Sequence, residues 1–221
     1  MAHFPTWPLI HFFVFILFSS IILIVLVKGS DKPLKTVTIA LFSMFALWSF
    51  GKIFLHNSIT PFEMAVFFDR LDAIAWASIP SLILWFGFTI TGNKRATGSS
   101  LLRVFLLFTA VFFIYLEWTG RLMAPPVRKY YGWNAEWLQD SPLPTLFFAF
   151  LSFAVIFNLV TLSLYAKKSY SSITKNQIRV LNITTVIPFL AALYFEFLMP
   201  KLRLPGWDSP AADAARGRIA S

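Results

Sequence analysis

Six apolar stretches, each close to the length that crosses a lipid bilayer, occupy most of this sequence. An α-helix needs about 20 residues to cross roughly 30 Å of hydrocarbon. The stretches lack the alternation of apolar and polar residues that marks the strands of a membrane β-barrel. We therefore predict an all-α polytopic transmembrane helix bundle with short connections. The six helices are expected at about residues 8–27, 36–55, 72–92, 101–119, 144–166 and 179–199.

The composition agrees with a membrane protein. Hydrophobic residues make up 57% of the chain and charged residues only 13%, whereas soluble domains have about 25% charged residues. The net charge of +9 would favour a nucleic-acid partner in a soluble protein. Here the basic residues stand in short runs between apolar stretches, so we expect the lipid bilayer as the partner and no nucleic acid. The first stretch is too long for the apolar part of a cleaved signal peptide.

The distribution of Lys and Arg predicts the orientation of the bundle, because cytoplasmic connections are enriched in these residues. Ten of them lie in or beside the connections after the first, third and fifth helices, against five on the opposite side. We therefore expect the N-terminus to lie outside the cell. Four more basic residues near the C-terminus reduce the difference to ten against nine.

The chain divides into a bundle, residues 1–205, and a polar tail, residues 206–221. The tail has no periodic apolar face, so we expect it to be disordered or a clipped end. With six helices both termini would lie outside, which would leave no cytoplasmic output. This indicates that a further helix is missing.

No catalytic motif is present in the sequence. It contains no HExxH, no GxSxG and no glycine-rich phosphate loop. Cysteine is absent. Of the three histidines, His3 and His56 are expected near the outer surface and His11 just inside the first helix, rather than as paired ligands at one depth. We therefore expect neither an enzyme in this chain nor a metal or other cofactor.

Charged residues gather where the predicted helices meet the outer surface. One interpretation is that they are ordinary interfacial residues. Asp69 and Asp72 would then lie in the first turn of the third helix and favour its N-terminal dipole. Glu117 and Arg121 would form an i,i+4 pair.

The other interpretation is a polar vestibule that senses a ligand. Four helices would present opposite charges at one depth beside tryptophan side chains, and the connection 128–137 could cover them. Carboxylates and an arginine would select charge, and a tryptophan would form an apolar wall. The candidate sensing residues are Asp69, Arg70, Asp72, Trp76, Glu117 and Glu196.

The second and third stretches also resemble a known family. ALWSF (46–50) together with FFDRLDAIAWASIPSLILWFGFTITG (67–92) is similar to the N-terminal seven-helix sensor region of bacterial histidine kinases. In that family the third helix follows an Arg-Leu pair and ends in a pattern of proline, phenylalanine and Tyr-Thr-Gly. Here Pro80 and Phe86 are present, and Ile90 stands in place of the tyrosine.

The likeness extends over residues 8–206, with YYGW (130–133) and the stretch from Pro200 to Gly206 as further points of similarity. It implies seven helices, an outer N-terminus and a cytoplasmic effector, usually a histidine kinase and sometimes a diguanylate cyclase. This sequence departs from the family in lacking a clear seventh helix, a phosphoacceptor H-box and ATP-binding boxes. It is therefore expected to be a fragment, a prematurely ended product or a stand-alone relative.

The function expected from the resemblance is that of a sensory input module in the bacterial inner membrane. It would bind a small extracellular or membrane-borne ligand at the outer half of the bundle. The signal would pass to an output domain, and a kinase-type output implies a homodimer. Two alternatives remain open, a fragment of a small transporter or permease and a non-catalytic subunit of a membrane complex. Asn158, Asn182 and the prolines within helices favour the transporter.

Overall fold

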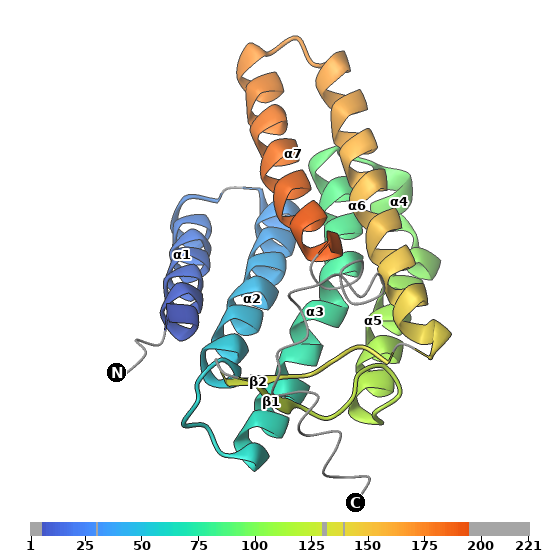
Figure 1. Ribbon diagram of the computed structural model, residues 1–221. Coiled ribbons are helices and arrows are strands. Elements are labelled where there is room, and N and C mark those ends of the chain that lie inside the picture. Colours follow the sequence, from blue (N-terminus) through green and yellow to red (C-terminus); the bar gives the residue numbers. More distant parts are fainter. Residues whose placement is uncertain (1–5, 30, 130–131, 139, 195–221) are drawn as a thin grey trace, which may run out of the picture.

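The computed structural model describes residues 6–29, 31–129, 132–138 and 140–194, and this part of the chain is mainly helical (Figure 1). The helices are α1 (Thr6–Lys28), α2 (Lys32–Leu55), α3 (Phe62–Ile90), α4 (Lys94–Gly98), α5 (Ser100–Trp118), α6 (Pro142–Lys168) and α7 (Ser172–Ala192). The strands are β1 (Val127–Lys129) and β2 (Gly132–Asn134).

The prediction of an all-α transmembrane bundle is confirmed. Five described helices, α1, α2, α3, α5 and α6, are long and apolar enough to cross a membrane. The sixth predicted helix corresponds to α7, which begins at Ser172 rather than at residue 179 and is described as far as Ala192. The short helix α4 and the two strands were not predicted, because each lies in a segment that was assigned to a connection.

Helix α2 also begins before its predicted start at residue 36. Asp31 caps it, since the Asp31 carboxylate accepts a hydrogen bond from the Leu34 backbone N–H at 3.0 Å. The basic residues that were taken as a connection belong to the helix. Lys35 bends back to donate to the Leu26 carbonyl oxygen at 2.6 Å, so its charge reaches the end of α1.

Helix α3 differs most from its prediction, because it starts at Phe62 instead of residue 72. Its 29 residues make it roughly 43 Å long at 1.5 Å per residue. The acidic residue of its first turn is Glu63. The expectation that Asp69 and Asp72 stabilise the first turn is therefore wrong. Both lie inside the helix and are buried, because neighbouring helices supply partners for their carboxyl groups.

Helix α3 is the centre of the bundle, with α2, α5 and α6 packed around it (Figure 1). Small residues make this possible, because they allow other helix backbones to approach closely. Four alanines of α3 are fully buried, namely Ala65, Ala73, Ala75 and Ala77. By contrast, α1 packs mainly on α2, and α7 packs mainly on α6.

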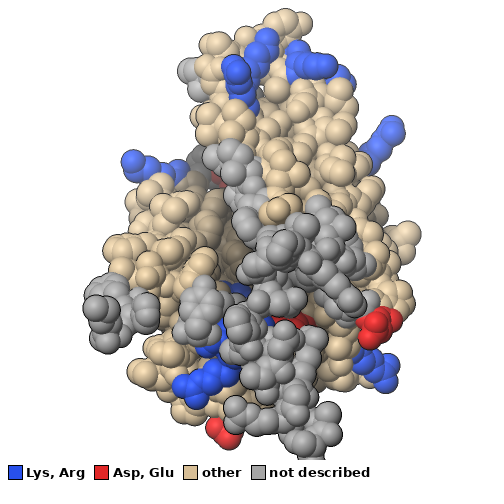
Figure 2. Space-filling model, in the orientation of Figure 1, with Lys and Arg blue, Asp and Glu red and all other residues tan. Residues whose placement is uncertain are grey.

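The two ends of the bundle differ in structure. At one end, the turn 56–61 between α2 and α3 lies beside the antiparallel hairpin β1–β2 (Figure 1). We call this the hairpin end. At the other end lie the connections α1–α2, α3–α4–α5 and α6–α7. Lys and Arg gather at the tip formed by α6 and α7, and uncharged surface extends below it (Figure 2). The long apolar helices are thus surrounded by the lipid bilayer.

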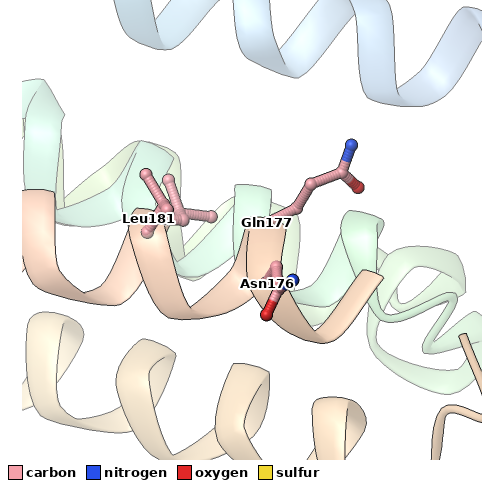
Figure 3. A pocket seen from close by; sticks show the side chains of 4 residues that line it. Asn176, Gln177 and Leu181 are labelled. Carbon is pink, nitrogen blue, oxygen red and sulfur yellow. The ribbon is translucent and has the colours of Figure 1, made fainter. Parts of the chain in front are cut away.

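A hollow lies on α7 near the basic tip, far along the chain from the predicted vestibule. It has a volume of about 450 Å³, is open, and is lined by Asn176, Gln177, Val180 and Leu181. Gln177 and Leu181 project from one side of the helix and Asn176 from another (Figure 3). These lining residues are uncharged and mainly present apolar surface, so the hollow is not the charged site that the sequence predicted.

The close approach of α3 and α6 depends on Gly87. A Cβ atom added at Gly87 would overlap the Asn158 side-chain oxygen Oδ1 on α6. Asn158 is buried, with 4% of its surface exposed, and its Oδ1 finds no hydrogen-bond partner among the described residues. The contact between glycine and asparagine therefore sets the distance between two helices in the apolar part of the bundle.

We predict that Gly87→Ala destabilises the protein by about 1–3 kcal/mol, the usual cost of overpacking. The measurement is thermal unfolding of the purified protein in detergent, followed by tryptophan fluorescence. Gly98→Ala is the matched control, because a Cβ there would meet nothing within 4 Å. Adding Asn158→Ala to Gly87→Ala should restore part of the lost stability. Equal melting temperatures for the Gly87 and Gly98 variants would contradict the prediction.

Candidate functional site

An ion pair joins α2 and α3 at the hairpin end. Lys52 Nζ lies 3.2 Å from Asp72 Oδ2, and the Asp72 side chain is only 1% exposed, against 20% for Lys52. Gly51, the neighbour of Lys52, leaves room for this pair, since a Cβ there would stand 3.0 Å from Asp72 Oδ1. A buried carboxylate needs such a partner, because an isolated charge loses its hydration.

A second polar contact joins α3 to α5. The carboxyl groups of Asp69 and Glu117 lie within hydrogen-bonding distance of each other. Both residues are buried, with 8% and 7% of their surfaces exposed. The Met123 backbone N–H also donates to Glu117. Because carboxylates only accept hydrogen bonds, a bond between these two groups requires a proton on one of them.

Two tryptophans, Trp118 on α5 and Trp76 on α3, make further contacts between elements. The Trp118 indole N–H donates to the Arg70 carbonyl oxygen at 3.0 Å, which is a further link from α5 to α3. Trp76 is half-buried, and its ring centroid lies 5.4 Å from that of Trp137 and 4.8 Å from that of Phe147. Trp76 therefore belongs to an aromatic cluster between α3, α6 and the segment after the hairpin.

The segment 122–138 contains the hairpin, and its two ends are paired with each other next to the carboxyl groups. The Leu138 N–H donates to the Leu122 carbonyl oxygen at 3.1 Å, and the Ala124 N–H donates to the Glu136 carbonyl oxygen at 2.8 Å. Met123, which donates to Glu117, therefore sits inside a paired segment.

The tip of the hairpin is fastened to the turn 56–61. The Trp133 indole N–H donates to the Thr60 carbonyl oxygen at 2.7 Å, and an Arg128 guanidinium N–H donates to the Ser58 carbonyl oxygen at 3.1 Å. Arg128 also lies over the Trp133 ring, 5.8 Å from its centroid. The segment that contains the hairpin thus contacts the α2–α3 turn through Trp133 and Arg128 and the carboxyl pair through Met123.

The structure brings together three of the sequence-predicted residues, Asp69, Asp72 and Glu117, and places Trp76 in the nearby aromatic cluster. Arg70 is exposed; its carbonyl oxygen accepts a hydrogen bond from Trp118, and its charge acts on Asp69. Glu196 lies outside the described residues. The predicted i,i+4 helical pair of Glu117 with Arg121 is wrong, because α5 ends at Trp118 and Gly120 turns the chain at φ 65°.

Sequence reasoning left two residues of the site out of the candidates. Lys52 is the cation of the buried pair. Ser49 stands one turn before it on the same face of α2 and is fully buried, and its hydroxyl has no hydrogen-bond partner among the described residues. The sequence did contain a signal for this ion pair: a lysine near the end of one apolar helix and acidic residues near the start of the next. Because the predicted start of α3 was too late, the sequence did not show that Lys52 and the acidic residues of α3 lie at the same depth.

His56 at the C-terminus of α2 packs against the N-terminal helix. Its ring centroid lies 4.9 Å from that of His11 and 6.1 Å from that of Trp7. Burial, followed by the nearby charge of Lys52 and by His11, lowers the pKa of His56 far below its usual range. His56 is therefore neutral near pH 7 and adds no positive charge to the site.

The sequence matches the family model described as the N-terminal 7TM region of histidine kinase over residues 10–208. The chain belongs to this family. The match covers most of the 221 residues and confirms the resemblance seen in the sequence. Comparisons with curated proteins and with solved structures found no match. The family makes the chain an integral membrane protein of the sensory input class, in keeping with its apolar helices.

We predict that Lys52→Met destabilises the protein by about 3–5 kcal/mol, because it removes the Lys52 charge from beside the buried Asp72 carboxylate. Adding the isosteric Asp72→Asn removes the remaining charge and should recover much of this loss. Thermal unfolding in detergent is the measurement.

The control for this experiment is Lys129→Met. Lys129 pairs with Glu136, whose side chain is 43% exposed, so its loss should cost less than about 1 kcal/mol. Equal destabilisation by the two lysine variants would show that burial of the Lys52 pair has no special importance.

Proposed function

We propose that the chain is the transmembrane input module of a two-component-type receptor, which senses at its hairpin end and relays the signal to a cytoplasmic output domain. One observation supports this most: a buried polar cluster, formed by Lys52, Asp69, Asp72 and Glu117, connects α2, α3 and α5 beneath the hairpin. Buried charges in a membrane bundle are costly, and they usually mark functional positions.

The cluster suits a sensor because its contacts are exchangeable. Lys52 acts electrostatically on Asp69 and Glu117 as well as pairing with Asp72. A stimulus that changes one of these electrostatic contacts also changes the strength of the others. Because the contacts join three helices, the packing of the helices changes with them. The bundle would then shift between two packing arrangements. This shift would change the positions of the helices at the opposite end, where an output domain would be attached.

The proposed orientation places the hairpin end outside the bacterial inner membrane. The Lys and Arg count supports it, since ten of these residues lie at the other end or beside it. The stimulus would then be a small ligand or ion from outside the cell or from the membrane. A kinase-type output further implies that the module works as a homodimer.

The permease alternative has less support. Asn158 packs against Gly87, and the Asn182 side-chain amide donates to the Ser163 hydroxyl at 3.0 Å. Both asparagines that favoured a transport path therefore take part in contacts between helices, as polar residues in membrane bundles commonly do.

We predict opposite accessibility for cysteines introduced at Ser58 and at Ser171. The chain has no cysteine of its own, and both positions are exposed. In intact cells, a membrane-impermeant maleimide should label Ser58→Cys, whereas Ser171→Cys should react only after permeabilisation. The reverse pattern would contradict the proposed orientation.

We predict that single substitutions in the cluster change signalling in a receptor that joins this chain to a histidine kinase core. Asp69→Asn, Asp72→Asn or Glu117→Gln should shift basal autophosphorylation in membranes by roughly five-fold or more, in the range of allosteric couplings of 1–3 kcal/mol. Glu63→Gln is the matched control, because Glu63 is an exposed carboxyl group of α3 at the same end. Unchanged activity in all three variants, with normal membrane levels, would refute sensing at the cluster.

A further inference from the structure

The carboxyl groups of Asp69 and Glu117 form a contact whose hydrogen bond depends on a proton. They come from different helices, α3 and α5, and they lie within hydrogen-bonding distance of each other in a buried site. Two ionised carboxylates at this separation repel strongly in a medium of low dielectric constant. A hydrogen bond between the two carboxyl groups therefore requires a proton on at least one of them.

A second observation separates this site from a mere group of acids. Glu117 Oε2 is buried and has no hydrogen-bond partner among the described residues, and the same holds for the Ser49 hydroxyl. An ionised Glu117 would leave charge on an oxygen that receives no hydrogen bond, which is costly in a buried place. A proton removes this cost.

We propose that Asp69 and Glu117 form a proton-binding site through which the module responds to the proton activity at the hairpin end. This inference rests on the proposed function and specifies its stimulus. With the proton bound, the pair carries one negative charge, and a hydrogen bond joins α3 to α5. When the proton leaves to water, the pair carries two negative charges, and the attraction between the helices becomes repulsion.

The neighbouring charged groups determine how this change spreads. Lys52 on α2 acts electrostatically on both carboxyl groups, and it also pairs with Asp72 on α3. Arg70 also acts on Asp69, although its side chain is exposed. Loss of the proton increases the attraction of the pair for Lys52, which weakens the hold of Lys52 on Asp72.

Further charged and titratable groups among the described residues lie beyond Lys52 and in the hairpin. His56, with His11 against it, is held neutral by burial and by Lys52, so it does not compete for the proton near neutral pH. In the covering segment, Lys129 and Glu136 pair with each other, and Arg128 binds the turn 56–61. The Met123 N–H bond to Glu117 carries any movement of that carboxyl group into the same segment.

The test is infrared difference spectroscopy of the full chain in liposomes, recorded between acidic and alkaline pH. A protonated carboxyl group has a C=O stretching band that a carboxylate lacks. The pair should contribute one such band, which is lost in a single step as the pH rises, in addition to the bands of the other carboxyl groups. Asp69→Asn and Glu117→Gln should each remove or shift this band, whereas Glu63→Gln should leave it unchanged. Tryptophan fluorescence should change with the same midpoint, because Trp76 and Trp118 lie on the two helices concerned.

The outcomes separate this inference from the proposed function. A titrating band assigned to the pair supports the proton site, even if the kinase fusion ignores pH, in which case the signalling role fails alone. No such band in the wild-type protein, or a band that survives in both pair variants, overturns the inference. If the kinase fusion still depends on the cluster in that case, the stimulus is something other than a proton. Circular dichroism and melting temperature show whether each variant is folded.

Discussion

The burial of charge at the hairpin end shapes the rest of this bundle. In an apolar protein surrounded by lipid, each buried carboxyl group needs a cation, a proton or a hydrogen-bond donor close by. Asp72 has Lys52 at 3.2 Å, and Glu117 has both Asp69 and the Met123 N–H. These partners come from α2, α3, α5 and the segment after α5. The requirement to satisfy three acids therefore fixes how three helices and the hairpin are placed relative to one another.

The small residues of α3 serve the same arrangement. Lys52 can reach Asp72 only if α2 lies close to α3, and Gly51 leaves the space that the Asp72 side chain fills. Farther along α3, Gly87 brings α6 near through its contact with Asn158. Apolar packing alone gives little preference between helix registers in a membrane, because lipid is as apolar as the side chains. Polar contacts and close approaches at glycine give that preference here.

The sequence predicted the class of fold well and the site only in part. Long apolar stretches are sufficient to locate the helices, because the bilayer sets their length. Charges were treated as the boundaries of helices, which misplaced the starts of α2 and α3. The error at α3 had consequences, since it put Asp69 and Asp72 at an exposed helix end when both are buried. Partnership between Asp69 and Glu117 could not be inferred, because 48 positions separate them and only the packing of α3 on α5 brings them together.

The position of the hairpin gives the cluster a route to the surface. An acid pair buried between two helices could be a purely structural contact, much as other buried polar groups are. Here the backbone that donates to Glu117 belongs to the segment whose other end binds the α2–α3 turn through Trp133 and Arg128. This turn directly follows α2, the helix that carries Lys52. A change at either carboxyl group can thus reach Lys52 directly through charge and indirectly through the hairpin. These connected contacts are a reason to include the hairpin, and not α3 alone, in the proposed sensing element.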